Sequence, residues 1–403
     1  MHRTTLSRVP GGRRLRPGIP GSSGRKGNSP CSGAAGTAGP DRYGDAIPTA
    51  ALLSFRLGGT DGVAVETAKW QGALARLGFA TFTVAGGGPV DHLLPGLAIG
   101  ADEPPTLGEV DAALAPADVV VVENLCSLPL NPRAADVVAT ALAGRPAVLH
   151  HHDLPWQRVR FAHHPPPPTD PRWSQVTINE LSRRQLGNRG LKATTVYNAF
   201  DVPAADRPGP ASGPDDTGPD AASRERVRRL LDVGPDECLV LQPTRAIPRK
   251  NVPGGVELCA RLGATFWLLG PAEDGYDDEL QAVMASARCR VLSGSPGHGG
   301  AVSIIDAYRA CDVVALPSTW EGFGNPTVES AIHRRPLAIG PYPVAAELAA
   351  FGFDWFGLGE ADRLAAWLAE PDPNLLHQNL AVAAAHFSLR DLPDRIAAIL
   401  PSW

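Results

Sequence analysis

The stretch ALPSTWEGFGNPTVESA, Ala315–Ala331, carries the clearest structural signal in the chain. The apolar run over 312–316 predicts a buried strand, because short β-branched runs bounded by turn residues are typical of strands. Asn325-Pro326 predicts a helix start, since Asn is a favoured N-cap and Pro suits the first helical position. The segment is therefore one strand–loop–helix unit, the building block of a parallel α/β sheet.

The loop of this unit has the features of a ligand site. Glycine on both sides of Phe323 lets the backbone approach a ligand closely. A helix start leaves N–H groups free to bind an anion or a hydroxyl. Glu321 in the loop and Glu329 about one turn inside the helix can accept hydrogen bonds from a diol. Two glutamates eight positions apart are by themselves typical of a solvated surface, but the glycines and the helix start between them favour a binding site.

The same alternation of strand and helix patterns extends along the chain in both directions. Apolar strands of this kind are buried on both faces of parallel sheets, so the sequence predicts an α/β protein with two doubly wound domains. Ligands of such sheets bind beyond the carboxyl ends of the strands, which directs attention to the loops that follow them. The predicted strands cover 51–55, 80–84, 119–122, 147–149 and 194–196, and then 238–242, 265–269, 289–292, 312–316 and 336–339.

Segments rich in Gly, Pro and Ser divide the chain. Residues 1–45 have too few apolar side chains to offset the entropy cost of folding, so we predict a disordered tail. The stretch 203–222 has the composition of a linker. These breaks predict a first Rossmann-like domain over 46–202 and a second over 223–385. The remaining segment, 386–403, is predicted to form a C-terminal helix that packs back on the first domain.

The composition excludes several classes of protein. The net charge is −5, and eight of the 37 Lys and Arg residues fall within 1–44, so the body of the chain is acidic and unsuited to nucleic acid. No apolar stretch is long enough to span a membrane. The six cysteines include no CxxC pair, which favours reduced thiols in the cytoplasm over a zinc site or disulfides. The sequence leaves open the oligomeric state and peripheral contact with a membrane.

Glu321 and Glu329, with GFGNP between them and a strand before them, resemble the signature of retaining glycosyltransferases of the GT-B fold, family 4. The resemblance spans about residues 50–350 and implies two Rossmann-like domains that face a central cleft. In that family the first Glu lies against the donor sugar, the intervening backbone contacts sugar and phosphate, and the second Glu binds the ribose. The resemblance thus implies a catalytic role for Glu321 and donor binding by Gly322, Phe323, Gly324, Asn325 and Glu329.

A second candidate site is the loop PTRAIPRKN, Pro243–Asn251, which follows the strand over 238–242. Departure of a nucleoside diphosphate builds negative charge on its phosphates, and fixed cations beside them would stabilise that charge. Arg245 and Lys250 are the candidates, and the family carries an Arg and a Lys at this spacing. Arg249 is predicted to be a solvent-facing neighbour. Because the chain has no Asp-x-Asp motif, we expect these cations in place of a metal-held diphosphate, and no cofactor besides the donor.

Other loops resemble donor and acceptor loops of GT-B enzymes. Gly58 and Gly59, after the strand over 51–55, resemble the glycine loop near the donor phosphates and the acceptor. They do not form GxGxxG, so a nicotinamide-dinucleotide site is not indicated. Asn198 matches a family position beside the cleft, and Gly270 stands where the family's donor loops fall.

Three consecutive histidines, His150 to His152, follow the strand over 147–149. Consecutive side chains of an extended segment point to alternating faces, and no carboxylate stands at ligand spacing, so we predict no metal here. The family places a functional His after this strand, near the transferred sugar. His152 fits that position best, because His-Asp-x-Pro continues like related sequences, and His151 is the second choice. Trp156 either lines the acceptor pocket or packs in the core.

Together these features predict a cytoplasmic, metal-independent enzyme that moves a hexose from a nucleotide sugar to an acceptor hydroxyl, with the retention of configuration that the resemblance implies. Three alternatives stay open: a GT-B nucleotide-sugar epimerase or phosphorylase, an oxidoreductase with two Rossmann-like halves, and a catalytically inactive sugar-binding protein. The missing glycine fingerprint counts against the oxidoreductase. The presence of both glutamates, Glu321 and Glu329, and of Arg245 and Lys250 counts against the inactive sugar-binding protein.

Overall fold

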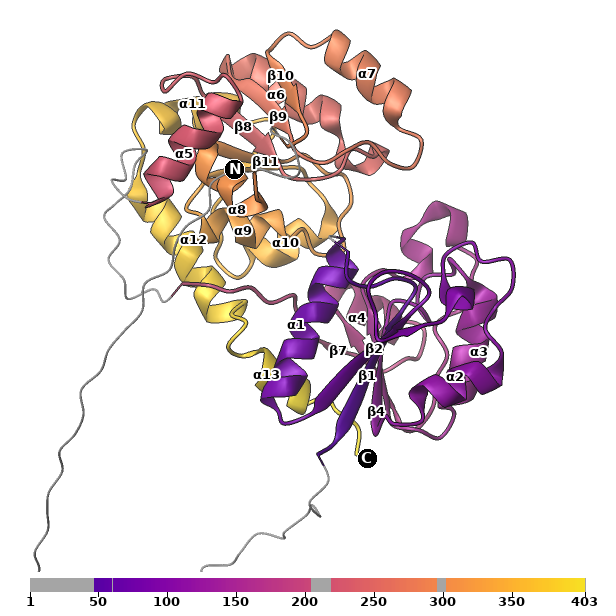
Figure 1. Ribbon diagram of the computed structural model, residues 1–403. Helices are drawn as coiled ribbons and strands as arrows, with labels where there is room; N and C mark the ends of the chain where they lie inside the picture. Colours follow the sequence, from indigo (N-terminus) through magenta and orange to yellow (C-terminus); the bar gives the residue numbers. More distant parts are fainter. Residues whose placement is uncertain (1–46, 60, 204–218, 296–301, 403) are drawn as a thin grey trace, which may run out of the picture. The chain divides into compact units, whose positions relative to one another are not determined.

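The computed structural model describes residues 47–59, 61–203, 219–295 and 302–402, and the chain from Ile47 onward forms one compact unit. The predicted tail over 1–45 and most of the predicted linker lie outside the described residues. Two parallel sheets with helices around them make up the described part (Figure 1). The strand–helix alternation of the sequence therefore predicted the fold class correctly.

The first sheet has seven strands in the order β3-β2-β1-β4-β5-β6-β7, all paired in parallel. In its centre Leu52 pairs with Val121, and both side chains are fully buried. The order reverses between β1 and β4, which makes this edge a binding position in doubly wound sheets. The strands are β1 (Thr49–Ser54), β2 (Ala80–Ala85), β3 (His92–Leu93), β4 (Val119–Glu123), β5 (Ala147–His151), β6 (Trp173–Thr177) and β7 (Thr194–Thr195).

The second sheet repeats the arrangement with the order β10-β9-β8-β11-β12-β13. Its reversal lies between β8 and β11, so the loops after these two strands lie at the same edge of the sheet. The strands are β8 (Leu239–Gln242), β9 (Thr265–Leu268), β10 (Val291–Ser293), β11 (Val313–Leu316), β12 (Leu337–Ile339) and β13 (Phe356–Gly357). The predicted strands do not include β3, β6 or β13. Two residues are too few to show a period in β3 and β13, and the polar Ser174 and Gln175 interrupt the apolar pattern of β6.

Helices cover the sheets, and several begin at well-formed caps. Asp61 accepts from the N–H of Ala64 at the start of α1, and Thr106 and Glu109 form a capping box at α2. The helices are α1 (Gly62–Arg76), α2 (Leu107–Leu114), α3 (Pro132–Leu142), α4 (Glu180–Gly187), α5 (Pro219–Leu230), α6 (Val252–Leu262), α7 (Asp277–Ala285), α8 (Ile304–Ala310), α9 (Pro326–Ile332), α10 (Pro343–Ala349), α11 (Ala361–Ala369), α12 (Pro373–His386) and α13 (Leu392–Ala397). Since α5 begins at Pro219, the linker predicted to reach 222 extends too far.

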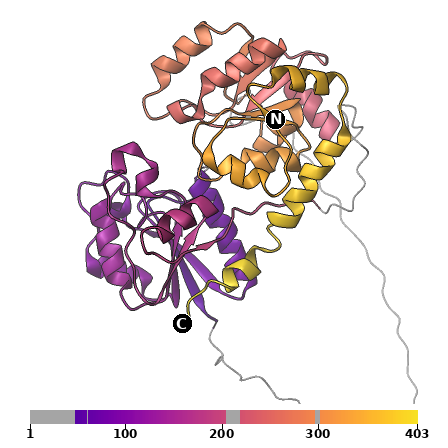
Figure 2. The same ribbon diagram turned by 180° about the vertical axis from the view of Figure 1, so that it is seen from behind.

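The end of the chain packs against the first sheet. Leu392 and Ile396 of α13 belong to the same buried cluster as Leu52 and Trp70. Arg76 of α1 donates to the carbonyl oxygens just before α13, at 3.3 and 3.4 Å. Figures 1 and 2 show α13 beside α1 from opposite sides. The C-terminal segment therefore packs against the first half of the chain.

Candidate active site

Glu321 and Lys250 join the two loops that the sequence singled out. The Nζ of Lys250 donates to Oε1 of Glu321 at 2.5 Å, and the hydroxyl of Ser318 donates to the same oxygen at 2.6 Å. Burial alone raises the pKa of Glu321, but the nearby Lys250 and Arg249 outweigh it, and the pKa is lowered. Burial lowers the pKa of Lys250. The loops after β8 and β11 therefore meet in a buried ion pair.

Arg249 is not the solvent-facing neighbour that the sequence predicted. Its Nη1 donates to Oε2 of Glu321 at 3.0 Å and to the carbonyl oxygen of Trp320 at 2.9 Å. The 3-10 turn Pro248–Lys250 brings two successive cations to one carboxylate, one to each oxygen. The basic loop thus contributes a third cation at the candidate site.

Arg245 is the more accessible of the two predicted cations. Its side chain is 35% exposed and pairs with Glu273 at 2.5 Å, whereas that of Lys250 is 11% exposed. Gly270 packs on the backbone of Arg245, because a Cβ at this glycine would lie 2.5 Å from both N and Cα of Arg245. Arg245 therefore offers a part-exposed cation beside the buried pair, and Gly270 permits the close approach of the two loops.

Gly322 and Gly324 allow contacts that a side chain would prevent. A Cβ at Gly322 would lie 2.7 Å from the carbonyl oxygen of His152. Gly324 has a φ of +91°, and a Cβ there would lie 2.2 Å from the hydroxyl of Tyr342. Glycine is the residue that fits both positions without displacing its neighbours. The EGFGNP loop is therefore in direct contact with the predicted histidine loop.

The side chain of Phe323 points into the protein. It is 3% exposed and packs against Tyr197, Phe200 and Phe387, with ring centroids 5.7 to 6.3 Å apart. This aromatic contact anchors the loop between its two glycines. Any contact of Phe323 with a donor would therefore come from its backbone.

The helix start at Asn325 differs from the sequence prediction. Asn325 is the residue before α9, but its side chain makes no capping bond, and its Oδ1 accepts from Nδ2 of Asn198 at 2.9 Å. The N–H groups of Thr327 and Val328 donate to the carbonyl oxygens of Gly324 and Asn325 at 2.9 and 3.0 Å. The expectation of free N–H groups at these two positions is therefore wrong, because a tight turn satisfies them.

Glu329 lies in α9 and meets a charge from the first half of the chain. The hydroxyl of Tyr308 donates to its Oε2 at 2.6 Å. Burial raises the pKa of Glu329, and the ammonium of Lys69 in α1 acts in the opposite direction. Lys69 also lies 4.2 Å from the ring centroid of Phe200 and pairs with Glu66. Neither Lys69 nor Glu66 was identified from the sequence.

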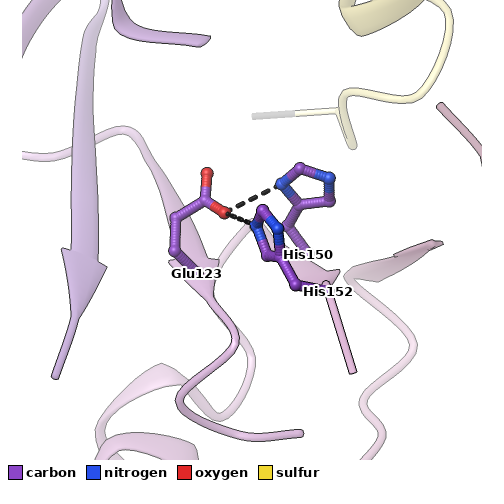
Figure 3. A group of neighbouring side chains, drawn as sticks. All are labelled: Glu123, His150 and His152. Atoms are coloured by element: carbon purple, nitrogen blue, oxygen red, sulfur yellow. Dashed lines mark hydrogen bonds and ion pairs between the residues drawn. The ribbon is translucent and has the colours of Figure 1, made fainter. Parts of the chain in front are cut away.

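The three histidines alternate in direction, as an extended segment requires. Nδ1 of His150 and Nε2 of His152 each lie 2.8 Å from Oε2 of Glu123, the last residue of β4 (Figure 3). His151 faces the other way, with its ring nitrogens bonded to Ser127 and to Oε1 of Gln175. Burial lowers the pKa of His151 to about 4. Of the two histidines proposed for the site, only His152 shares a face with Glu123.

The carboxylate beside these histidines was missed because it comes from another strand. β4 and β5 are neighbours, and Glu123 pairs with His150 in the register of the sheet. One ligand atom from each of Glu123, His150 and His152 lies within 4.8 Å of the others, close enough to hold a metal ion. At N–O distances of 2.8 Å both histidines hydrogen-bond to this carboxylate, while Oε1 of Glu123 and Nε2 of His150 are buried without a partner among the described residues. The sequence argument considered only carboxylates close to the histidines along the chain, and it therefore missed Glu123.

Gly58 and Gly59 line a groove of about 1030 Å³ beside α1, which also includes Lys69, Arg76 and Asp91. Gly58 has a φ of +74°, and a Cβ there would lie 2.5 Å from Pro89. The groove thus places the predicted glycine loop beside two basic side chains of α1, Lys69 and Arg76.

Trp156 is half-buried, so it is neither a core residue nor fully exposed. Its indole N–H donates to Oε1 of Gln185 at 2.9 Å, and the guanidinium of Arg189 lies 3.7 Å from its ring centroid. α4 and the residues after it therefore hold the indole in place.

Among the described helices, none is long and apolar enough to cross a membrane.

Comparisons with known proteins agree with this architecture. No protein-family model matches the chain. The chain is 25% identical to the mannosylglucosylglycerate synthase of Thermotoga maritima, over 87% of this chain and 99% of the relative. The solved structure of Anabaena Alr3699/HepE in complex with UDP-glucose has a TM-score of 0.63 at 20% identity, over 87% of this chain and 98% of that one. WaaG, a glycosyltransferase involved in lipopolysaccharide biosynthesis, has a TM-score of 0.57 at 14% identity, with 87% and 99% covered.

The two kinds of similarity establish different things. The structural neighbours establish the GT-B fold, since their sequence identity is too low to carry more. The curated relative, matched along almost its whole length, identifies the chain as a glycosyltransferase enzyme.

Proposed function

We propose that this enzyme is a retaining, metal-independent glycosyltransferase of family 4 that moves a hexose from a nucleotide sugar to an acceptor hydroxyl. The observation that carries the proposal is the buried pair of Lys250 and Glu321, which joins the basic loop to the EGFGNP loop. A nucleoside diphosphate bound there would meet Arg245 and Lys250 at its phosphates. The same two loops would contact the sugar through Glu321 and Gly322.

The positions of the remaining residues support further proposed roles. Glu329, half-buried and bonded to Tyr308, would accept hydrogen bonds from ribose hydroxyls. His152, in contact with Gly322 through its carbonyl, would lie beside the transferred sugar. The developing charge on the leaving diphosphate would be stabilised by the two cations, and its oxygen would take the proton of the acceptor on the same face.

The acceptor is proposed to bind in the groove beside Gly58 and Gly59. Lys69 and Arg76 line this groove, so an acceptor with a carboxylate would suit it. The name of the Thermotoga relative describes a product with mannosyl, glucosyl and glycerate units. A glycosylglycerate is therefore the first acceptor to test.

The proposal is tested in two steps. Thermal unfolding with UDP, GDP or ADP identifies the donor base, because a ligand at 100 times its dissociation constant adds about 2.7 kcal/mol of stability. The matching nucleotide sugars are then incubated with glycosylglycerate and other hydroxyl acceptors, with and without EDTA, and the anomeric configuration of the product is read by NMR. An inverted product, or activity that requires an added metal ion, would contradict the proposed mechanism. Conversion of the donor without an acceptor would favour an epimerase.

A further inference from the structure

The side chains of Glu123, which ends β4, and of Asn124 hold the histidine segment through four hydrogen bonds. Oε2 of Glu123 accepts from His150 and His152, each at 2.8 Å. Oδ1 of the next residue, Asn124, accepts from the backbone N–H groups of His152 and Asp153, each at 3.1 Å. Glu123 is fully buried, and Asn124 and His152 are 5% and 6% exposed. One dipeptide thus controls both the ring and the backbone of His152.

The carboxylate determines which nitrogen of His152 carries a proton. An ionised carboxylate only accepts hydrogen bonds, so Nε2 of His152 must donate to Glu123. Nδ1 is then the ring nitrogen left to meet a ligand. His150 donates through Nδ1 in the same way, and its Nε2 is buried without a hydrogen-bond partner among the described residues. Its ring packs against Trp70 with centroids 4.2 Å apart, so His150 is a spacer with no ligand-facing nitrogen.

We propose that Glu123 and Asn124 are positioning residues for sugar transfer, which hold His152 with Nε2 bound and Nδ1 directed to the transferred sugar. The inference rests on the proposed function, because that function brings the sugar to His152. Glu123 orients the ring, and Asn124 fixes the backbone beside Gly322 of the donor loop.

The backbone of Asn124 suits this task. Its φ is +61°, a left-handed conformation that Asn tolerates better than most residues and that Gly adopts freely. Asn124 can therefore turn the chain sharply after β4 while its side chain reaches the loop after β5. A glycine variant removes the side-chain acceptor without straining the backbone.

Three carboxylates near His152 raise its pKa. Glu123 from β4, Glu66 from α1 and Asp153 from its own loop all favour the protonated ring, while the neighbouring His150 ring lies 4.5 Å away. Lys69 pairs with Glu66 and reduces the effect of that carboxylate. Burial lowers the pKa of His152, but its bond to Glu123 outweighs burial, and the pKa is raised. Removal of Glu123 should therefore lower this pKa.

The test compares Glu123→Gln, His152→Ala and the double variant in the full-length enzyme. We expect Glu123→Gln to lower kcat/KM by about tenfold or more, with the nucleotide dissociation constant changed less than about twofold. The pH at which activity follows the protonation of His152 should move down, because the carboxylate that raises its pKa is gone. In the double variant the loss should equal that of His152→Ala alone, because Glu123 acts only through this ring. An additional loss in the double variant would overturn the inference.

A second pair of variants covers the case in which Glu123→Gln does not fold. Asn124→Gly removes the acceptor of the two N–H groups, whereas Asn124→Asp keeps it. We expect kcat to be lowered in Asn124→Gly and to stay close to that of the wild type in Asn124→Asp.

Asp312→Asn is the matched control for Glu123→Gln. Asp312, like Glu123, accepts from two basic side chains, Arg224 and Arg228, but it belongs to the second half of the chain. It should lower the melting temperature and leave the pH profile unchanged.

NMR of ¹⁵N-labelled imidazoles separates this inference from the proposed function. The His152 signal, assigned by its loss in His152→Ala, should show a proton on Nε2 in the free enzyme, whatever reaction is catalysed. A proton on Nδ1 instead, or activity lost to EDTA and restored by a divalent cation, would overturn the inference. Absence of transfer from any nucleotide sugar, with the expected tautomer present, would count against the proposed function alone.

Discussion

Lys250 and Glu321 stand 71 positions apart in the chain, yet Nζ of the lysine lies 2.5 Å from Oε1 of the glutamate in a buried ion pair. The pair connects the loops after β8 and β11, which are neighbouring strands of the second sheet. Nη1 of Arg249 lies 3.0 Å from the other carboxylate oxygen, Oε2 of Glu321. The carboxylate thus has two cationic partners, whereas the ammonium has one anionic partner among the described residues.

This imbalance predicts unequal effects on stability. Glu321→Gln leaves Lys250 and Arg249 without their carboxylate, and breaking a buried pair in this way costs about 3–5 kcal/mol. Lys250→Met should cost less, because Arg249 still pairs with the carboxylate. Urea unfolding of both variants, with the double variant for comparison, measures the difference. A larger loss for Lys250→Met would contradict this account.

Arg245 and Glu329 are predicted to affect different kinetic constants. Arg245 would act on charge that develops only as the diphosphate leaves, so Arg245→Ala should lower kcat by about 100-fold with little change in KM for the donor. Glu329 would bind the ribose equally in the ground and transition states. Glu329→Ala should therefore raise the donor KM by about tenfold and leave kcat nearly unchanged. Identical kinetic profiles for the two variants would refute this division.

The pairing of Glu123 with His150 and His152 predicts that the folded protein loses stability in acid. Burial alone raises the pKa of this carboxyl, but His150 and His152 outweigh it and lower the pKa to about 2 from the usual 4.5. A carboxyl with a lowered folded-state pKa contributes stability above the unfolded value, and this contribution is lost as the pH falls from 4.5 towards 2. The difference in unfolding free energy between wild type and Glu123→Gln should therefore shrink over this range. A constant difference would show that the carboxylate is not paired.

The sequence predicted the parts of the site that lie within one loop. Glu321, the two glycines around Phe323, and Lys250 each follow a recognisable strand, so their position at the edge of a parallel sheet followed from the strand pattern alone. Whether those side chains would pair with each other could not be read from the sequence. Their partnership depends on β8 and β11 being adjacent, which requires the strand order.

The residues that were missed or misplaced depend on contacts between loops. Glu123 ends an apolar run that indicates a strand. Its partners are 27 and 29 positions away, His150 on the neighbouring strand β5 and His152 just after it. A polar residue at the carboxyl end of such a run was the signal that could have identified it. Arg249 was assigned to solvent because its partner is 72 positions distant. Asn325 looked like a helix cap, but Asn198 competes for its side chain.

Glu347 of α10 is predicted to stabilise the start of α4. Its carboxylate accepts from the N–H groups of Glu180 and Leu181 at 2.7 and 2.9 Å, and from the hydroxyl of Tyr197 at 2.8 Å. Since a carboxylate at a helix N-terminus satisfies free donors, Glu347→Ala should cost about 2 kcal/mol in urea unfolding. Glu347→Gln keeps one oxygen acceptor and should lose about half as much. Equal stability of all three proteins would disprove this role.

Gly270 offers a test of the basic loop that leaves every charge in place. An alanine Cβ at this position would meet the backbone of Arg245 at 2.5 Å, and backbone atoms cannot move aside cheaply. We expect Gly270→Ala to cost about 1–3 kcal/mol of stability and to lower kcat as Arg245→Ala does, because it displaces the guanidinium. The matched control is Gly108→Ala in α2, where no atom lies within 4 Å of the added methyl group. That variant should gain about 0.5–1 kcal/mol and keep its kcat. Unchanged turnover in Gly270→Ala, despite lower stability, would show that the position of Arg245 does not limit the reaction.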